Sequence, residues 1–501
     1  MVLHPLTTPL TPAQARHLLR RACFSADPAR IEDITGRVPG EVVREWVSAP
    51  VDSWFLLDPS WMGRYYPPSG ASNDEVQSFL QASAYYVEEV RTEWMSEILS
   101  GSFRARVALF WHDHFVTDVR KYRYGALAFR YAQLLVLSAF GDFRQFVRSV
   151  SVNGAMLYYL DGRYNTRSAP NENFARELME LFTMGQVNRS GQENYTQEDI
   201  REGARALTGW RMNVRSSWRG YLASGNFDAG TKTFLGRTGR LTVNDVVDVI
   251  FEERREQVAE FISAKLVAEF VHPEAEADLL DAAAAHLLAV DFDIGEFLTG
   301  LLGSEAFFDQ KYCGTRIRNP IELVATQISL TRSASEAAAA GAKRFTDEVG
   351  QTLLAPPNVA GWTGHKAWLN TDLLPRRWRT SEWIAGLVTS RDGVGHLLER
   401  LLPADSTHPA LDVALAIAET VFAVDLEHVS IPEPDEPFAG DLDQAPLPDD
   451  FLNGPAWRQN LLKLFLDGTP WYEWNPASDL GRVQVMNYVR QLSQLPEYQL
   501  S

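Results

Sequence analysis

Carboxylates and an amide in one short segment are the first candidates for chemistry. The segment PNENFARELMELFTMG, residues 170–185, is the densest polar cluster of the chain. On a helix with about 100° per residue, Asn173, Glu177 and Glu180 lie within roughly 60° of one another, beside an apolar face. Carboxylates held beside a core need a cation, either an arginine or a metal ion. Glu177 and Glu180 are therefore candidates to bind a metal jointly or to share a proton.

The second candidate segment is WHDHF, residues 111–115. His112 and His114 are two positions apart, so on a helix they point about 160° away from each other. Both can bind one ion only if the helix ends or bends there. Asp113 between them could orient a neighbouring imidazole from outside the ligand set. The same histidines could equally be capping or hydrogen-bonded core residues.

Arginines offer a purely structural alternative for the glutamates. Arg201 and Arg205 are four residues apart, so they share one helix face and could form bidentate ion pairs with Glu177 or Glu180. In that case the carboxylates and arginines would only tie helices together. If the glutamates are instead catalytic, Arg205 is a candidate to act with them.

An aromatic loop, residues 355–378, could form the wall of a substrate pocket. It contains Trp362, His365, Trp368 and Asn370 among glycines and prolines. Aromatic rings and amides in a rigid loop suit a sugar or a peptide, although plain loop packing is the alternative. Asn173 and Trp210 are further candidates for substrate binding.

Two isolated residues are weaker candidates. His17 lies on its own amphipathic helix, where a structural role is the alternative to chemistry. Cys313, beside Lys311 and Arg316, is either a reactive thiol or a small buried residue. The chain has no nucleophile elbow, phosphate-binding loop or dinucleotide-binding turn that would name a standard reaction.

The elements that position these residues are predicted to be helices. Helical periodicity dominates the chain and strand alternation is scarce, so we expect an all-α fold, a large multi-helix bundle-like assembly with a few short hairpins or irregular loops. In the second half, helices are expected at 243–271, 274–290, 295–303, 320–334, 336–354, 380–391, 409–423, 455–467 and 479–496.

Changes in composition divide the chain into five predicted parts. These are an N-terminal helical domain at 1–215, a loop or hairpin insertion at 216–240, a second helical region at 241–430, an acidic proline-rich loop at 431–454, and C-terminal helices at 455–501 that fold back onto the body.

Length and charge narrow the class of protein. The 501 residues carry a formal net charge of −18, which makes nucleic acid an improbable partner. Two cysteines provide no disulfide framework. No signal peptide and no membrane-spanning run is recognisable, so we expect a cytoplasmic protein, with a periplasmic or exported location as the alternative.

Several segments together resemble one bacterial family. They include ARHLLRRACF, LFWHDHFVT, PNENFARELMELFTMG, NYTQEDIREGARALTGW and GQTLLAPPNVAGW, in the family's order and over nearly the whole chain. The chain is similar to the family known as domain of unknown function 1800. The family-like positions of this sequence are His17, His112, His114, Asn171, Glu172, Asn173, Arg176, Glu177, Glu180, Arg205, Thr208, Gly209 and Trp210.

The resemblance implies a large helical protein and a candidate partner, but no reaction. Family members often sit beside a gene for a sulfatase-like family, domain of unknown function 1501, which implies that the two products act together. This chain has Phe227-Asp228 where members usually have His-Asp, so any role of that histidine is lost. Many members also look exported.

Two function hypotheses follow. The first is a metal-dependent hydrolase or oxidoreductase, with His112, His114, Glu177 and Glu180 holding zinc, iron or manganese. The second is a non-catalytic partner, chaperone or scaffold for the sulfatase-like protein.

Overall fold

The computed structural model describes most of the chain. The described residues are 2–329, 336–379, 391–402, 406–423, 426, 429, 431 and 455–501. The acidic proline-rich segment predicted at 431–454 therefore lies outside the described residues except for its first residue. Almost all of the helix predicted at 380–391 lies outside them too.

Helices dominate the first half of the chain, and short sequence signals begin them. Thr11 and Ser72 each cap a helix through a reciprocal pair of hydrogen bonds with the residue three positions later, Gln14 and Glu75. The helices are α1 (Pro12–Cys23), α2 (Pro28–Ile34), α3 (Pro39–Ser48), α4 (Asn73–Leu99), α5 (Phe103–His114), α6 (Val119–Tyr122), α7 (Gly125–Leu137), α8 (Phe143–Ser151), α9 (Gly154–Tyr159), α10 (Glu172–Glu177) and α11 (Gln197–Ala206).

The polar segment at 170–185 is helical but not uniformly so. Helix α10 passes directly into a π-helix, Leu178–Thr183, in which the Thr183 hydroxyl donates to the Leu178 carbonyl five residues earlier. Such wide turns are uncommon and often occur at functional sites. Glu177 therefore ends a regular helix, whereas Glu180 lies within the wider turn.

Two small hairpins follow α11. Strand β1 (Trp210–Asn213) pairs antiparallel with β2 (Arg219–Leu222), and β3 (Lys232–Phe234) pairs antiparallel with β4 (Arg237–Gly239). In the described part of the chain these are the two sheets, and each has two strands. The predicted all-α class with a few short hairpins is confirmed.

The second half is again helical. Its helices are α12 (Val243–Glu253), α13 (Arg255–Phe270), α14 (Ala277–Ala289), α15 (Ile294–Leu302), α16 (Pro320–Ser329), α17 (Glu336–Glu348), α19 (Arg391–Leu401), α20 (Pro409–Val421), α22 (Ala456–Leu466) and α23 (Asp479–Gln494). The single helix expected at 243–271 is two helices, because the chain leaves helical geometry at Arg254. The helix expected at 336–354 ends at Glu348, before the aromatic loop.

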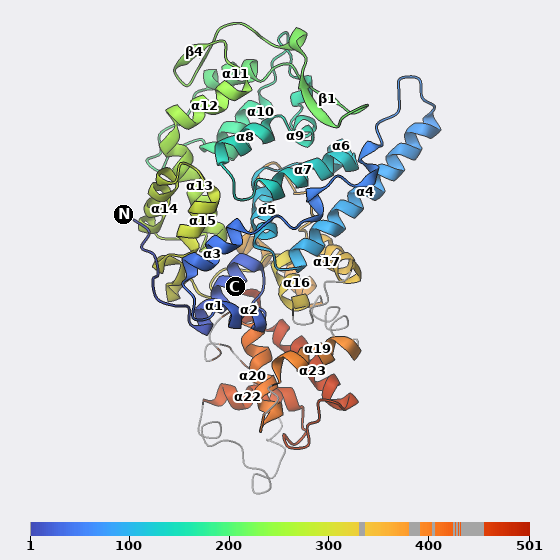
Figure 1. Ribbon diagram of the computed structural model, residues 1–501, viewed down its shortest axis with the longest axis vertical. Coiled ribbons are helices and arrows are strands. Elements are labelled where there is room, and N and C mark those ends of the chain that lie inside the picture. The colour runs from blue at the N-terminus through green and yellow to red at the C-terminus, as the bar shows by residue number, and fades with distance from the viewer. Residues whose placement is uncertain are drawn as a thin grey trace.

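The molecule is elongated, and α5 lies near its middle (Figure 1). The hairpins, α11 and α12 lie at one end, and α19, α20, α22 and α23 at the other. Helix α5 contacts α1, α3, α4 and α7. Its residues Val107, Ala108 and Trp111 are fully buried in the main hydrophobic core.

The last residues of the chain reach back to the segment before α16. Backbone hydrogen bonds join Arg316 to Ser501 and Arg318 to Gln499, and the buried Tyr498 hydroxyl donates to the Leu323 carbonyl. This pairing fixes residues 316–318, which lie beside the site described next. Within the described residues, no helix is long and apolar enough to cross a bilayer.

Candidate functional site

Three consecutive residues at the end of α5 contact three different segments. The Leu354 N–H donates to His112 Nε2 at 2.9 Å, and the Trp362 N–H donates to Asp113 Oδ1 at 2.7 Å. His114 Nε2 lies 3.0 Å from the Phe182 carbonyl oxygen. The WHDHF segment therefore connects the helix to the aromatic loop on one side and to the π-helix on the other.

His112 is a fully satisfied core histidine. Because its Nε2 accepts a hydrogen bond from the Leu354 N–H, the single ring proton is on Nδ1, which donates a hydrogen bond to the Tyr131 hydroxyl at 3.1 Å. Tyr131 in turn donates to the Phe115 carbonyl. Burial lowers the pKa of His112 to about 3, so the ring stays neutral.

His114 orients a lysine. Since a carbonyl only accepts, His114 donates from Nε2 to Phe182 and offers the lone pair of Nδ1 to the Lys265 ammonium, 3.3 Å away. Lys265 also donates to the Leu181 carbonyl at 3.3 Å. Burial and the Lys265 charge lower the pKa of His114 well below its usual value. Both carbonyls belong to the π-helix, which thereby helps to position Lys265.

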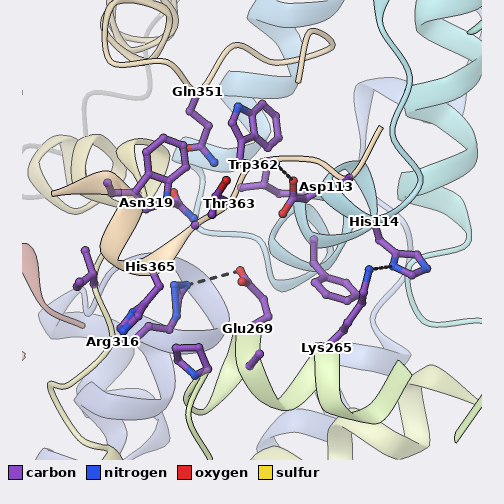
Figure 2. A pocket seen from close by; sticks show the side chains of 18 residues that line it. Asp113, His114, Lys265, Glu269, Arg316, Asn319, Gln351, Trp362, Thr363 and His365 are labelled. Carbon is purple, nitrogen blue, oxygen red and sulfur yellow. Dashed lines mark hydrogen bonds and ion pairs between the residues drawn. The ribbon is translucent and has the colours of Figure 1, made fainter. Parts of the chain in front are cut away.

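Asp113 and Lys265 line a cavity of about 310 Å³ (Figure 2). Helix α13 contributes Lys265 and Glu269, one helical turn apart, and the aromatic loop contributes the opposite wall. The polar and aromatic residues that line it are Phe110, Asp113, His114, Lys265, Glu269, Arg316, Asn319, Gln351, Trp362, Thr363, His365 and Trp368. We call this space the Asp113 cavity.

The two central charged groups of the cavity have shifted pKa values. Burial, and the negative charge of Glu269, raise the pKa of Asp113 to about 7, against the opposing Trp362 hydrogen bond and Lys265 charge. Burial lowers the pKa of Lys265 to about 8, and the charge of Asp113 limits that shift. A carboxyl group and an amine that both titrate near neutral pH are typical of acid–base sites.

A network of buried ions forms one side of the cavity. Arg106, whose side chain is fully buried, donates to Glu269 and, at 2.7 Å, to Glu322. Arg316 donates to both oxygens of Glu322 and lies 3.5 Å from Glu269. Although burial raises the pKa of Glu322, the charges of Arg316 and Arg106 lower it overall. These contacts hold Glu269 and Arg316 in fixed positions at the cavity.

Gly361 allows the aromatic loop to approach Asp113. A Cβ at this position would lie 2.2 Å from Asp113 Oδ1, and the backbone φ is +83°. Glycine alone meets both demands without strain. The Gly361-Trp362 pair thus delivers the N–H that fixes one oxygen of the carboxyl group.

Only some of the residues predicted from sequence meet at this cavity. His114, Trp362, His365 and Trp368 line it. Asn370 does not, because it is exposed and its side-chain oxygen accepts from the backbone N–H groups of residues 372 and 373. Asn173, which is exposed, and Trp210, which begins strand β1, are also outside the lining.

Glu177 and Glu180 are neighbours, as their spacing indicates, but they lie outside the cavity lining. Burial and then the charge of Glu180 raise the pKa of the half-buried Glu177. The Tyr195 hydroxyl donates to Glu180 at 3.2 Å. We call these two residues the Glu177–Glu180 pair.

The expected arginine partners bind elsewhere. Arg205 pairs with Asp228 at 2.8 Å and with Glu202 at 2.7 Å, and Arg201 pairs with Glu198 at 3.0 Å. The expectation that they pair with Glu177 or Glu180 is wrong. Their carboxylate partners lie on α11 itself, at Asp228 beyond the first hairpin and, for Arg201 at 3.9 Å, at Glu172 on α10. His17, the separate candidate, is buried in α1, and its Nε2 lies 3.2 Å from the Phe307 carbonyl oxygen.

The metal site predicted from sequence does not form from its four residues. Among the described residues, no group of three or more His, Cys, Asp or Glu side chains could hold a metal ion. Both ring nitrogens of His112 are used in the core, and the free lone pair of His114 faces an ammonium group. His112, His114, Glu177 and Glu180 therefore do not fit zinc, iron or manganese together.

Sequence reasoning missed Lys265, Glu269, Asn319 and Gln351. One signal was present for the first two: they are charged residues four apart in the otherwise apolar run SAKLVAEF. No local pattern distinguishes Asn319 or Gln351, because their place in the cavity depends on how α16 and the aromatic loop pack together.

The fold and the site thus define a mainly helical protein with a charged cavity, open to the surface, beside its central helix. Residues 17–470 match the family described as "Protein of unknown function (DUF1800)". The chain belongs to that family, as its sequence motifs predict. No curated protein and no solved structure matched it.

Proposed function

We propose that this chain is a hydrolytic enzyme in which Asp113 transfers protons to and from a small polar substrate bound in the Asp113 cavity. The observation that carries this proposal is a single positioned carboxyl group. Asp113 lines the cavity with one oxygen held by the Trp362 N–H, and its pKa is raised to about 7. A group that is half protonated near neutral pH can act as an acid in one step and as a base in another.

The neighbouring groups supply the electrostatics. Lys265 donates to His114 and to the Leu181 carbonyl, which fixes its ammonium at the cavity wall. There it can stabilise negative charge that develops on a substrate oxygen. In the hydrolysis, water loses a proton to Asp113 as its oxygen attacks, and the protonated Asp113 returns that proton to the leaving group.

The test is a substitution that keeps the shape of the site. Asp113→Asn retains an oxygen for the Trp362 N–H but cannot take a proton. The probes are p-nitrophenyl esters, glycosides, phosphate and sulfate. For the probe that the wild type hydrolyses, we expect kcat to fall by about 10²- to 10⁴-fold. Glu177→Gln, outside the cavity, is the matched control and should leave kcat unchanged.

Two results would contradict the proposal. One is an Asp113→Asn variant with the kcat of the wild type. The other needs no substrate. If NMR titration of ¹³C-labelled carboxyl groups gives Asp113 an ordinary pKa of about 4, the group is fully ionised at neutral pH and cannot act as the proposed acid.

The metal-dependent form of this hypothesis has a direct measurement. Elemental analysis of the purified protein and of His114→Ala reports bound zinc, iron or manganese. Because the His114 lone pair faces Lys265, we expect the metal content of the two proteins to be equal. A near-stoichiometric ion that disappears in the folded variant would restore the metal hypothesis.

The non-catalytic alternative stays a prediction from the family resemblance. It holds that the chain is a partner or scaffold for a sulfatase-like protein of the domain of unknown function 1501 family. Co-purification of the two proteins at micromolar concentration tests it, and a stable complex would make this alternative a second function to pursue.

A further inference from the structure

One end of the Asp113 cavity is rich in nitrogen donors. Arg316, Asn319 and His365 line this end, with Thr363 between them and the Asp113 end (Figure 2). The pairing of residues 316–318 with the last residues of the chain, and the ion pairs of Arg316, hold this wall in place.

The buried ions behind this wall carry an unbalanced positive charge. Three guanidinium groups, of Arg21, Arg106 and Arg316, interact with two carboxylates, of Glu269 and Glu322. Arg21 is almost fully buried and its Nε and Nη1 have no hydrogen-bond partner in the described structure. Arg316, at 6% side-chain exposure, likewise has an unpartnered buried Nε. A buried, uncompensated cation is costly, and a nearby anion would offset that cost.

His365 adds a second, independent observation. Its Nδ1 is buried and has no hydrogen-bond partner among the described residues. Its backbone lies in the left-handed region, with φ of 43°, which non-glycine residues rarely adopt. Strain of this kind persists where the surrounding structure enforces it, often at ligand sites. The His272 ring, 5.6 Å away between centroids, supports the His365 ring from one side.

We propose that the Arg316–His365 end of the cavity binds the anionic group of the substrate, a carboxylate or a tetrahedral oxyanion such as a sulfate or phosphate ester. This inference deepens the proposed function, and it rests on that function in taking the bound anion to be part of the substrate. The bond to be cleaved would then lie toward Asp113 and Lys265 at the other end. Arg316 would donate to the anion together with the neutral ring of His365, which can carry its proton on the unpartnered Nδ1, and Asn319 would be a neutral neighbour.

The size and the charges of the cavity select the ligand class. About 310 Å³ is at the small end of ligand pockets, which suits a single ring or a short chain. In a chain of net charge −18, the cations Lys265 and Arg316 in the lining, with the buried charge of Arg21 behind Arg316, are a local exception that would draw in anions. Neutral sugars would gain the aromatic contacts of Trp362 and Trp368 but not the ionic ones.

The test is calorimetric titration of the full chain with glucuronate, inorganic sulfate and inorganic phosphate, at constant ionic strength in sodium chloride. Glucose is the neutral counterpart of glucuronate. We expect saturable binding of at least one anion and about tenfold weaker or no binding of glucose. Comparing the affinity for glucuronate with the affinities for sulfate and phosphate shows whether the site prefers a carboxylate or a tetrahedral oxyanion.

Two variants locate the site. His365→Ala removes the unpartnered nitrogen, and Arg316→Lys keeps the charge but loses the planar donor set. Each should weaken anion binding by about tenfold or more. Arg237→Lys is the matched control, because Arg237 is half-exposed on β4 and pairs with Glu252 and Glu253. If Arg316→Lys does not fold, His365→Ala alone decides.

Three results would overturn the inference: no saturable binding of any anion, glucose binding as tightly as glucuronate, or unchanged anion binding in folded His365→Ala. The Asp113→Asn variant separates this inference from the proposed function. It should bind the anion as tightly as the wild type or more tightly, because it removes a negative charge. Anion binding with an undiminished kcat in Asp113→Asn would refute the catalytic role alone, whereas loss of kcat without anion binding would refute the anion site alone.

Discussion

Asp113 in the cavity and Glu177 in the Glu177–Glu180 pair are both carboxyl groups with a raised pKa, yet they differ in what surrounds them. Asp113 meets a lysine, a second carboxylate and a fixed backbone N–H inside a cavity. Glu177 is half-buried and faces mainly another glutamate. The difference is that only Asp113 has both a cavity and a cation beside its perturbed carboxyl group, a combination found more often at functional sites.

The two regions are nevertheless connected. The π-helix that contains Glu180 directs the carbonyls of Leu181 and Phe182 toward Lys265 and His114. The most polar segment of the sequence thus serves the cavity through its backbone, while its carboxylates point elsewhere. A series of measurements can sharpen or break this contrast.

The largest expected difference between the regions is in the pH dependence of stability. The pKa of Asp113 is about 7 when folded and near 4 when unfolded, so the folded state binds more protons between those values. The free energy of unfolding should therefore fall as pH rises from about 4 to 7. Asp113→Asn removes this loss and should be more stable than wild type at pH 8, by at most about 4 kcal/mol.

Denaturant unfolding at several pH values measures this effect. Glu177→Gln should show a change of the same sign but smaller, because Glu177 is half-buried. If the free energy of unfolding depends on pH in the same way in Asp113→Asn and in wild type, then Asp113 has no raised pKa and the contrast between the two regions is wrong.

The next effect concerns the contact that holds the start of the aromatic loop, where the Leu354 N–H donates to His112. His112→Ala should destabilise the protein by about 2 to 3 kcal/mol, because it leaves the buried Leu354 N–H without its acceptor. Thermal unfolding followed by circular dichroism measures it. A destabilisation below about 0.5 kcal/mol would show that the loop does not depend on this contact.

A smaller effect tests which charges tune each carboxyl group. Lys265→Met should raise the pKa of Asp113 further, by about one unit, since it removes the cation that favours ionisation. Glu180→Gln should lower the pKa of Glu177, because it removes a like charge. NMR titration of labelled carboxyl groups measures both pKa values. An unchanged Asp113 pKa in Lys265→Met would show that the Lys265 charge does not act on Asp113.

The smallest effect is expected at Arg205. Arg205→Gln loses ion pairs with Asp228 and Glu202 near the surface, which should cost about 1 kcal/mol or less. It should leave the pKa values of Asp113 and Glu177 unchanged in the same titration. A shift of the Glu177 pKa would instead support the arginine–glutamate pairing expected from the sequence.

The helical class was predictable because it depends on local signals. Capping residues such as Thr11 and Ser72 begin helices where the sequence places them, and apolar periodicity marks their buried faces. The break at Arg254 was missed because the polar run EERREQ at 252–257 contains no glycine or proline that would mark a helix end. The π-helix was missed because the expected 100° step assumes a regular helix.

The site was predictable only in part. The sequence pointed to WHDHF and to the aromatic loop, and the structure brings His114, Trp362, His365 and Trp368 to one cavity. The sequence also pointed to the Glu177–Glu180 pair as metal ligands. Side-chain types alone cannot decide whether two neighbouring glutamates bind a metal. Whether a histidine binds a metal or a carbonyl depends on the groups that face it, and those come from distant segments.

By itself, the sequence determined the family, the helical class and the two motif segments that the fold uses at its centre. Tertiary structure alone decided which of their residues meet. Three adjacent side chains on α5 diverge to Leu354 just before the aromatic loop, to Trp362 in that loop and to the π-helix, because successive helical residues point in different directions. Lys265, Glu269 and Arg316 join Asp113 because α13 lies along α5, with Lys265 at His114 and Glu269 at Arg106, and because the segment before α16 brings Arg316 to Glu269. Burial there shifts the pKa values of Asp113 and Lys265, and burial is a property of the packed chain.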